Sequence, residues 1–255
     1  MRRLSRPLWL AASVAVAAAI VLLWQAVADA KLVSPVFLPG PDRAWRALVK
    51  GLTEGDLLAR WLGTIRHMFF GWLLASLVGV GLGAAIGSSE RARAYLGPTL
   101  ELMRPLPASA IVPLAISLFG LSQSMVLAVI AFGALWPMLL ATVHGFAAVE
   151  PRLYEVSRAL GLSRWEQIHK VSLPSSMPDI LSGMRLGLTI ALILAVVGEM
   201  LASQEGLGSQ ILLAARSFRA ADLYAGVILL GVTGYATAAL LGGVEGRVLR
   251  WRQTR

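Results

Sequence analysis

Long apolar stretches separated by short polar ones dominate the pattern of this chain. A hydrocarbon core about 30 Å thick is crossed by on the order of 20 helical residues at 1.5 Å each, so stretches of this length predict membrane-spanning helices. The pattern therefore predicts an all-α membrane protein with six spans. They are residues 8–28, 68–86, 106–121, 125–149, 180–202 and 223–244.

The third of these spans is the least regular. Residues 106–121 form a short stretch that holds Pro107 and Pro113, which remove backbone donors and are expected to kink a helix. Exposed kinked backbone is costly in lipid, so we expect neighbouring helices to shelter this span.

Composition supports the membrane interpretation. Hydrophobic residues make up 57% of the chain and charged residues 15%, which lies outside the usage of soluble domains. The chain has no cysteine, which excludes disulfides, thiolate metal sites and a cysteine nucleophile. The net charge of +9 is spread between the apolar stretches and forms no single basic face, which argues against nucleic-acid binding.

The N-terminus allows an alternative to the first span. Arginines precede the apolar stretch, and residues 26–30 read Ala-Val-Ala-Asp-Ala, similar to a secretory cleavage site. A signal-peptide core is typically about 7 to 15 residues, whereas this stretch is closer to 20, which favours an uncleaved span.

Cationic residues predict the orientation, because cytoplasmic loops carry an excess of them. Six spans place both termini on the same side of the membrane. If that side is the cytoplasm, most of the external cations fall in residues 29–65, and the positive-inside rule is least strict for a segment of this length. The cytoplasmic cations are then Arg2, Arg3, Arg6, Arg91, Arg93, Arg152, Arg158, Arg164, Lys170, Arg247, Arg250, Arg252 and Arg255.

These patterns divide the chain into three parts. Residues 1–65 hold the first span and the external segment, residues 66–246 the remaining transmembrane domain, and residues 247–255 a basic cytoplasmic tail. The external segment contains an amphipathic helix pattern, with Trp45, Leu48, Val49 and Leu52 at helical spacing.

Glycines recur every fourth residue in several spans and so share one helical face. This spacing predicts close helix packing at three places, although lipid-facing glycine is common enough to account for any single case. The glycines are Gly79, Gly83 and Gly87, then Gly183 and Gly187, then Gly242 and Gly246.

The polar loop at residues 150–174 predicts two short helices joined at a glycine. Pro151 suits the first turn of a helix that runs to Leu160, and Gly161 suits the left-handed residue that ends it. Ser163 and Glu166 have capping-box spacing and start the second helix. Pro174 is expected to stop that helix soon after residues 169–172.

This loop has two interpretations. Its charges alone fit a solvated hairpin. A solvated hairpin does not explain why apolar residues accompany the two arginines Arg158 and Arg164; these apolar residues are Leu160, Leu162, Trp165 and Ile168. A surface that combines apolar side chains with charge favours contact with a partner protein.

The loop resembles that of the inner-membrane permeases of binding-protein-dependent ATP-binding-cassette importers. Their motif reads Glu-Ala-Ala, three residues, Gly, nine residues, Ile-x-Leu-Pro. Here Glu155-Val156-Ser157, Gly161 and Val171-Ser172-Leu173-Pro174 keep that spacing with small or aliphatic replacements. The resemblance runs from about Thr64 to the C-terminus, and is strongest for the nitrate, sulfonate and taurine branch.

The resemblance implies a type I importer permease bundle in the bacterial inner membrane. It also implies a homodimer of permeases, two cytoplasmic ATPase subunits and an extracytoplasmic solute-binding protein that delivers a small anion. The chain itself would be no enzyme and would bind no cofactor. ATP and Mg would be used by the ATPase, in line with the absence of a Gly-Lys phosphate loop here.

In this family the loop is the coupling helix, which is seated in a groove of the ATPase. The resemblance therefore assigns ATPase coupling to Glu155, Arg158, Leu160, Gly161, Leu162, Arg164, Trp165, Ile168, Leu173 and Pro174.

Two ionisable residues inside a span are candidates for the translocation path or a gate, because charge within lipid is costly. Glu199 would repel an anion, so hydrogen bonding or gating is favoured over ligand contact. Arg185 either faces an inner vestibule or reaches the cytoplasmic boundary as a snorkelling side chain. Glu101 and Arg104 are expected to pair on one helical face.

Two other classes remain to be weighed. A secondary transporter or channel would also show kinked spans and intramembrane charge, but would not need the glycine-joined loop. A membrane enzyme or metal site would need clustered ligands, whereas His67, His144 and His169 lie in different segments.

Overall fold

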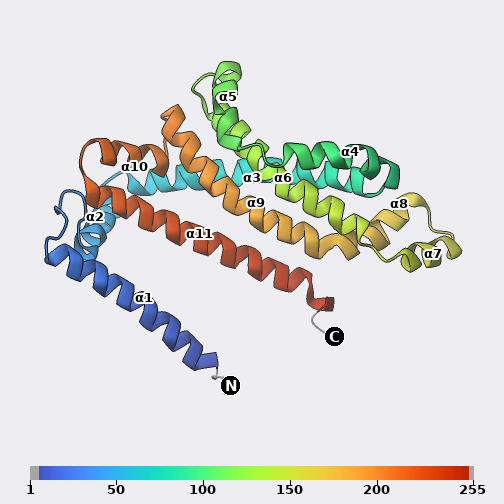
Figure 1. Cartoon of the computed structure of the whole chain (residues 1–255), viewed down its shortest axis with the longest axis horizontal. Helices are drawn as coiled ribbons and strands as arrows, with labels where there is room; N and C mark the ends of the chain where they lie inside the picture. The colour runs from blue at the N-terminus through green and yellow to red at the C-terminus, as the bar shows by residue number, and fades with distance from the viewer. Residues whose placement is uncertain (1–5, 253–255) are drawn as a thin grey trace.

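The computed structural model describes residues 6–252, and the side chains of residues 11–251. The predicted cytoplasmic cations Arg2, Arg3 and Arg255 lie outside the described residues. Every regular element within the described part is a helix (Figure 1). The elements are α1 Arg6–Asp29, α2 Pro41–Thr53, α3 Leu57–Gly87, α4 Glu90–Met103, η1 Ala108–Ile111, α5 Val112–Phe119, α6 Gln123–Ala147, α7 Pro151–Ala159, α8 Arg164–Gln167, η2 Ile168–Ser172, α9 Leu173–Ala202, α10 Leu207–Arg216, α11 Ala220–Val248 and η3 Arg250–Arg252.

Five of the six predicted spans are present as long apolar helices. They are α1, α3, α6, the run Arg164–Ala202 that ends with α9, and α11. A sixth is present if α4 and the segment Ala108–Phe119, which bend by 83° at a short break, are counted as one broken span. The all-α prediction is thus confirmed.

The bent pair corrects the predicted span 106–121. Its first half is α4, which begins at Glu90, and the break falls just before η1. Pro107 precedes η1, and Pro113 lies in the first turn of α5. The N–H groups of a first turn have no partner within the helix, so a proline there costs no hydrogen bond. Neither proline therefore kinks a helix interior, and the bend comes from the break between helices.

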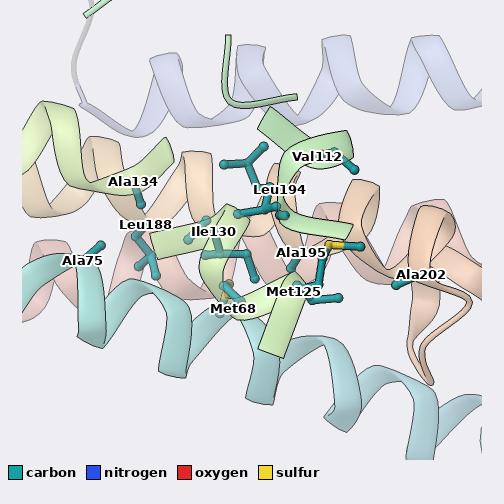
Figure 2. Packing of buried hydrophobic residues seen from close by; sticks show 14 of the residues in the cluster. Met68, Ala75, Val112, Met125, Ile130, Ala134, Leu188, Leu194, Ala195 and Ala202 are labelled. Carbon is teal, nitrogen blue, oxygen red and sulfur yellow. The ribbon is translucent and has the colours of Figure 1, made fainter. Parts of the chain in front are cut away.

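The core of the bundle is α6 packed between α3 and α9 (Figure 2). Met68 of α3, Ile130 of α6 and Leu194 of α9 meet there, each under 7% exposed. The helices approach closely because glycines face their neighbours. Gly83 lies against Thr142 and the Leu139 carbonyl of α6, which confirms the predicted face of α3.

The other two glycine pairs differ from one another. On α9, Gly183 lies against the Pro137 carbonyl and Gly187 against Met138, so this predicted packing is also confirmed. On α11, a Cβ at Gly242 would meet only the end of an arginine side chain, and one at Gly246 would meet open space. This third pair makes no close helix contact among the described residues.

The segment after α1 packs on the opposite end of the bundle from the α7–α8 loop (Figure 1). The predicted amphipathic helix is confirmed as α2, where Leu48 is buried and Trp45 is 61% exposed. Leu48 joins a second buried cluster with Leu57, Leu207 and Leu229. The predicted external segment runs to residue 65, and α3 already begins at Leu57, whose side chain packs into the cluster.

The first span lies apart from the bundle (Figure 1). Its apolar window is not buried by the rest of the described chain, and its half-buried residues lie at its C-terminal end. There the Trp24 ring lies 5.3 Å from that of Tyr224, and its indole N–H donates to the Pro39 carbonyl at 3.0 Å. Most of α1 is therefore free to face lipid or another subunit.

A glycine substitution on each face of α3 tests the packing. Gly83→Ala places a methyl group 2.6 Å from Thr142 Cβ and 2.8 Å from the Leu139 carbonyl, so the helices must separate. Overpacking of this kind costs about 1 to 3 kcal/mol. We expect a lower thermal midpoint for the solubilised protein, measured by fluorescence-detected size-exclusion chromatography after heating.

Gly81→Ala is the matched control, because Gly81 lies on the exposed face with open space around a Cβ. It should leave the midpoint unchanged or raise it, since alanine favours helix by roughly 0.5 to 1 kcal/mol over glycine. Equal midpoints for the two variants would show that α3 does not pack on α6 through this face.

Candidate coupling loop and buried carboxylate

The loop after α6 has the glycine corner that its sequence predicts. Helix α7 begins at Pro151 and ends at Ala159, and Gly161 follows with φ +70°. The Gly161 N–H donates to the Arg158 carbonyl and the Leu162 N–H to the Ser157 carbonyl, both at 3.0 Å. These two bonds form a Schellman motif, which needs a left-handed residue at the corner.

The second helix of the loop begins with the predicted capping box. The Glu166 N–H donates to Ser163 Oγ at 3.3 Å, and the Ser163 N–H donates to Glu166 Oε2 at 3.0 Å. Both prediction and structure place the start of α8 directly after Ser163.

The prediction that Pro174 stops this helix is wrong. Residues from α8 continue through η2 into α9, so the run Arg164–Ala202 is unbroken. The η2 turn is a π-helix, in which the Leu173 N–H donates to the Ile168 carbonyl five residues back. This wider turn makes room for a proline ring that would otherwise clash with the carbonyl four residues earlier.

The loop presents apolar and cationic side chains together. Leu160 is 71% exposed and Trp165 is 69% exposed. Among the other predicted coupling residues, Glu155, Arg158, Gly161 and Arg164 are exposed, and Leu162, Ile168, Leu173 and Pro174 are half-buried. The structure thus brings all ten together on one end of the bundle, with Leu160 and Trp165 as its protruding apolar groups.

Glu199 lies at the other end of α9 and is fully buried. Its Oε2 accepts hydrogen bonds from Thr64 Oγ1 and from the Gly208 N–H, both at 2.9 Å. Its Oε1 lies 2.9 Å from His67 Nδ1. The Leu207 N–H in turn donates to Thr64 Oγ1 at 2.8 Å. One carboxylate therefore joins α3, α9 and the first turn of α10.

Glycines make this buried cluster possible. A Cβ at Gly206 would overlap the Glu199 carboxyl group, and one at Gly208 would meet the Val196 carbonyl. The carboxylate receives a backbone N–H at a helix start, where donors lack intrahelical partners. Both oxygens are satisfied by this chain, which favours a hydrogen-bonding role for Glu199 over contact with a solute.

Arg185, the other candidate for the path, pairs with Glu245 of α11. Its side chain is 46% exposed, and the contact joins α9 to α11. The choice between a vestibule and a snorkelling role stays a prediction. Arg104 lies 3.8 Å from Glu101, as the sequence predicts, with both side chains about two-thirds exposed.

Sequence reasoning singled out Glu199 but did not pair it with Thr64 or His67. Thr64 and His67 lie more than 130 residues away in sequence, and their polar atoms gave no local signal. The spacing of Thr64 and His67 places both on one face of α3, which is the only sequence feature that could have linked them.

Removal of the Glu199 carboxylate should weaken the bundle. Glu199→Ala leaves His67 and the Gly208 N–H buried without their acceptor, and each unsatisfied group costs about 1 to 3 kcal/mol. Glu199→Gln keeps an acceptor for Thr64 and Gly208. We expect a clearly lower thermal midpoint for the alanine variant and a smaller loss for glutamine.

Glu205→Ala removes an exposed carboxylate nearby and serves as the control. A midpoint for Glu199→Ala that matches this control would contradict the structural role of the cluster.

Comparison with known proteins agrees with these features. A family described as the binding-protein-dependent transport system inner membrane component matches residues 75–250. A Bacillus subtilis (strain 168) protein named for transport of aliphatic sulfonates is 33% identical over 93% of this chain and 86% of its own length. The taurine transport system permease protein of Escherichia coli (strain K12) is 28% identical over 94% of this chain and 89% of its own length. The nitrate import permease protein of Leptolyngbya laminosa is 29% identical over 77% of this chain and 71% of its own length.

Solved structures share the fold at low sequence identity. The inward-facing MetNI methionine ABC transporter aligns with a TM-score of 0.64 at 17% identity, over 76% of this chain and 95% of that one. An amino acid ABC transporter with histidines aligns with a TM-score of 0.61 at 15% identity, over 82% of this chain and 98% of that one. The bundle thus has the fold of type I importer permeases, and the chain belongs to the family of inner-membrane permease components of binding-protein-dependent transport systems.

Proposed function

We propose that this chain is the permease subunit of an ATP-driven importer for small organic or inorganic oxyanions. The single observation that carries the proposal is the α7–α8 loop, where exposed Leu160 and Trp165 stand beside Arg158 and Arg164 at one end of the bundle. The relatives are named for sulfonates, taurine and nitrate, which all present negatively charged oxygens.

Coupling would use the unbroken helix that leaves the loop. An ATPase subunit that binds the loop in two positions would shift the start of α8, and the run Arg164–Ala202 would carry that movement into the core. The Gly161 corner would let α7 and α8 move as one docked unit. Nucleotide-dependent binding energy would then bias inward-open against outward-open arrangements.

The assembly would contain two copies of the permease, two ATPase subunits and an extracytoplasmic solute-binding protein. Helix α4 supports the second copy, because none of its residues is buried within this chain. Tyr95 and Leu102 on α4 are 82% and 76% exposed. Both termini would lie in the cytoplasm, on the side of the α7–α8 loop.

Substitutions at Gly161 test the coupling. A Cβ at this position would meet no other group, so any effect comes from the backbone at φ +70°. Gly161→Val strains that conformation, whereas Gly161→Asn tolerates it. We expect the valine variant to lose ATPase co-purification and ATP-dependent uptake while the asparagine variant retains both.

A pair of charge insertions tests the docking surface itself. Leu160→Asp should weaken ATPase binding by roughly tenfold or more, because a buried leucine contributes about 1.5 to 3 kcal/mol. Leu32→Asp is the control, since Leu32 is similarly exposed at 74% but lies at the other end of the bundle. Normal co-purification and uptake for both Gly161→Val and Leu160→Asp would overturn the coupling and favour a secondary transporter.

Cysteine labelling tests the orientation, and the cysteine-free chain has no background. We expect an impermeant maleimide to label Leu32→Cys in intact spheroplasts and to label Arg252→Cys only after lysis. The positive-inside excess is the reason for this expectation. Labelling of Arg252→Cys before lysis would reverse the proposed topology.

A further inference from the structure

Helix α2 lies where several helices of the bundle begin. Its buried Leu48 belongs to a cluster with Leu57, the first residue of α3, and Leu207, the first residue of α10. The members from α11 are Ala225 and Leu229, in its second and third turns. Figure 1 shows α2 at the end of the bundle, between α1 and the start of α3. The helix is therefore level with the first turns of these helices.

An aromatic pair marks the same level. The Trp24 ring, near the end of α1, lies 5.3 Å from the Tyr224 ring, near the start of α11. The Trp24 indole N–H also donates to the carbonyl of Pro39, two residues before α2 begins. Tryptophan and tyrosine gather where a bilayer meets water, because each side chain combines an apolar ring with a polar group. These contacts place the start of α2 at a membrane surface.

The two flanks of α2 differ in character. Trp45 and Val49 are four residues apart and share one side of the helix, where they are 61% and 42% exposed. Arg43 and Lys50 are seven residues apart and share another side, where both are exposed. Leu48 faces the bundle between these sides. Helix α2 thus has an apolar flank, formed by Trp45 and Val49, and a cationic flank, formed by Arg43 and Lys50.

A cavity beside the cationic flank shows which way that flank faces. The cavity has a volume of about 470 Å³, and its lining includes the charged residues Lys50, Glu54, Arg60 and Asp222. Ionised side chains of both signs are very costly in hydrocarbon, so this cavity faces water or lipid headgroups. The apolar flank lies on the opposite side of Leu48, which directs it toward the acyl chains.

We propose that α2 is an interfacial helix, with its apolar flank inserted into the leaflet farther from the α7–α8 loop and its cationic flank among the headgroups. Tryptophan on one side and cations on another are typical of helices that lie in the plane of a membrane surface. Lipid is the occupant that this level supplies, since apolar side chains at a membrane surface meet acyl chains without a partner protein. The inference goes beyond the proposed import function and does not depend on it.

Lipid contact at α2 reaches the buried carboxylate through the packing of the chain. Leu48 shares its cluster with Leu207, whose N–H donates to Thr64 Oγ1 at 2.8 Å. Thr64 Oγ1 in turn donates to Glu199 Oε2 at 2.9 Å. An inserted α2 therefore holds the first turn of α10 in place beside α3 and the end of α9.

Spin labels on two adjacent residues test this arrangement, and the cysteine-free chain allows single labelling sites. The full chain in phosphatidylcholine nanodiscs carries the label at Val49→Cys or at Lys50→Cys. Its accessibility to oxygen, which concentrates in lipid, is compared with that to a water-soluble nickel complex. We expect oxygen access to dominate at residue 49 and nickel access at residue 50, because consecutive residues lie about 100° apart around a helix. Val232→Cys, in the middle of α11 and 51% exposed, is the lipid reference.

A carboxylate on the apolar flank should withdraw that flank from the bilayer. We expect Trp45→Glu to shift the label at Val49→Cys from oxygen to nickel access. Lys50→Glu is the matched control, since it places the same group on the cationic flank and should leave that label in lipid.

Three results would overturn the proposal. Dominant nickel access at both residues 49 and 50 would place α2 in water, and dominant oxygen access at both would place it within the hydrocarbon. Low access to both reagents at residue 49 would assign the apolar flank to a protein partner, such as a second copy of this chain. The measurements use neither ATP nor an ATPase, so none of these results bears on the proposed import function.

Discussion

Close contact between helix backbones is the constraint on which the rest of this structure depends. Lipid tails are as apolar as leucine, so helices in a bilayer gain little from burying apolar side chains and associate through tight packing and hydrogen bonds. Gly83 of α3 and Gly183 of α9 supply that packing, since each faces a backbone carbonyl of α6. With α6 held on both sides, the position and tilt of α9 are fixed, and α9 connects the docking loop with the buried carboxylate.

Each end of α9 is secured by a different kind of interaction. At its start, the capping box of Ser163 and the π-turn of η2 join the loop to the helix without a break. At its end, Glu199 binds α3 and the first turn of α10. A helix continuous between a docking loop and a buried polar cluster can transmit a displacement, whereas a helix stopped at Pro174 would have separated the loop from the bundle.

The sequence allowed prediction of local features and of the positions of the spans. Apolar length located the helices that cross the membrane, and local rules located Gly161 and the Ser163 cap, because these depend on residues within one turn of each other. The prediction that Pro174 ends the helix was wrong because the π-turn of η2 accommodates the proline ring. The bend of the third span was assigned to Pro107 and Pro113 inside a helix, whereas it falls at the break before η1. The partners of Glu199 depend on tertiary contacts, which no local pattern encodes.

The buried carboxylate at the end of α9 depends on the groups around it. An ionised carboxylate without partners would be very costly in a low-dielectric interior. Thr64 Oγ1 and the Gly208 N–H donate to one oxygen of Glu199, and His67 Nδ1 lies within hydrogen-bond distance of the other. These partners come from α3 and from the first turn of α10, so the end of α9 is fixed only when all three helices are in place.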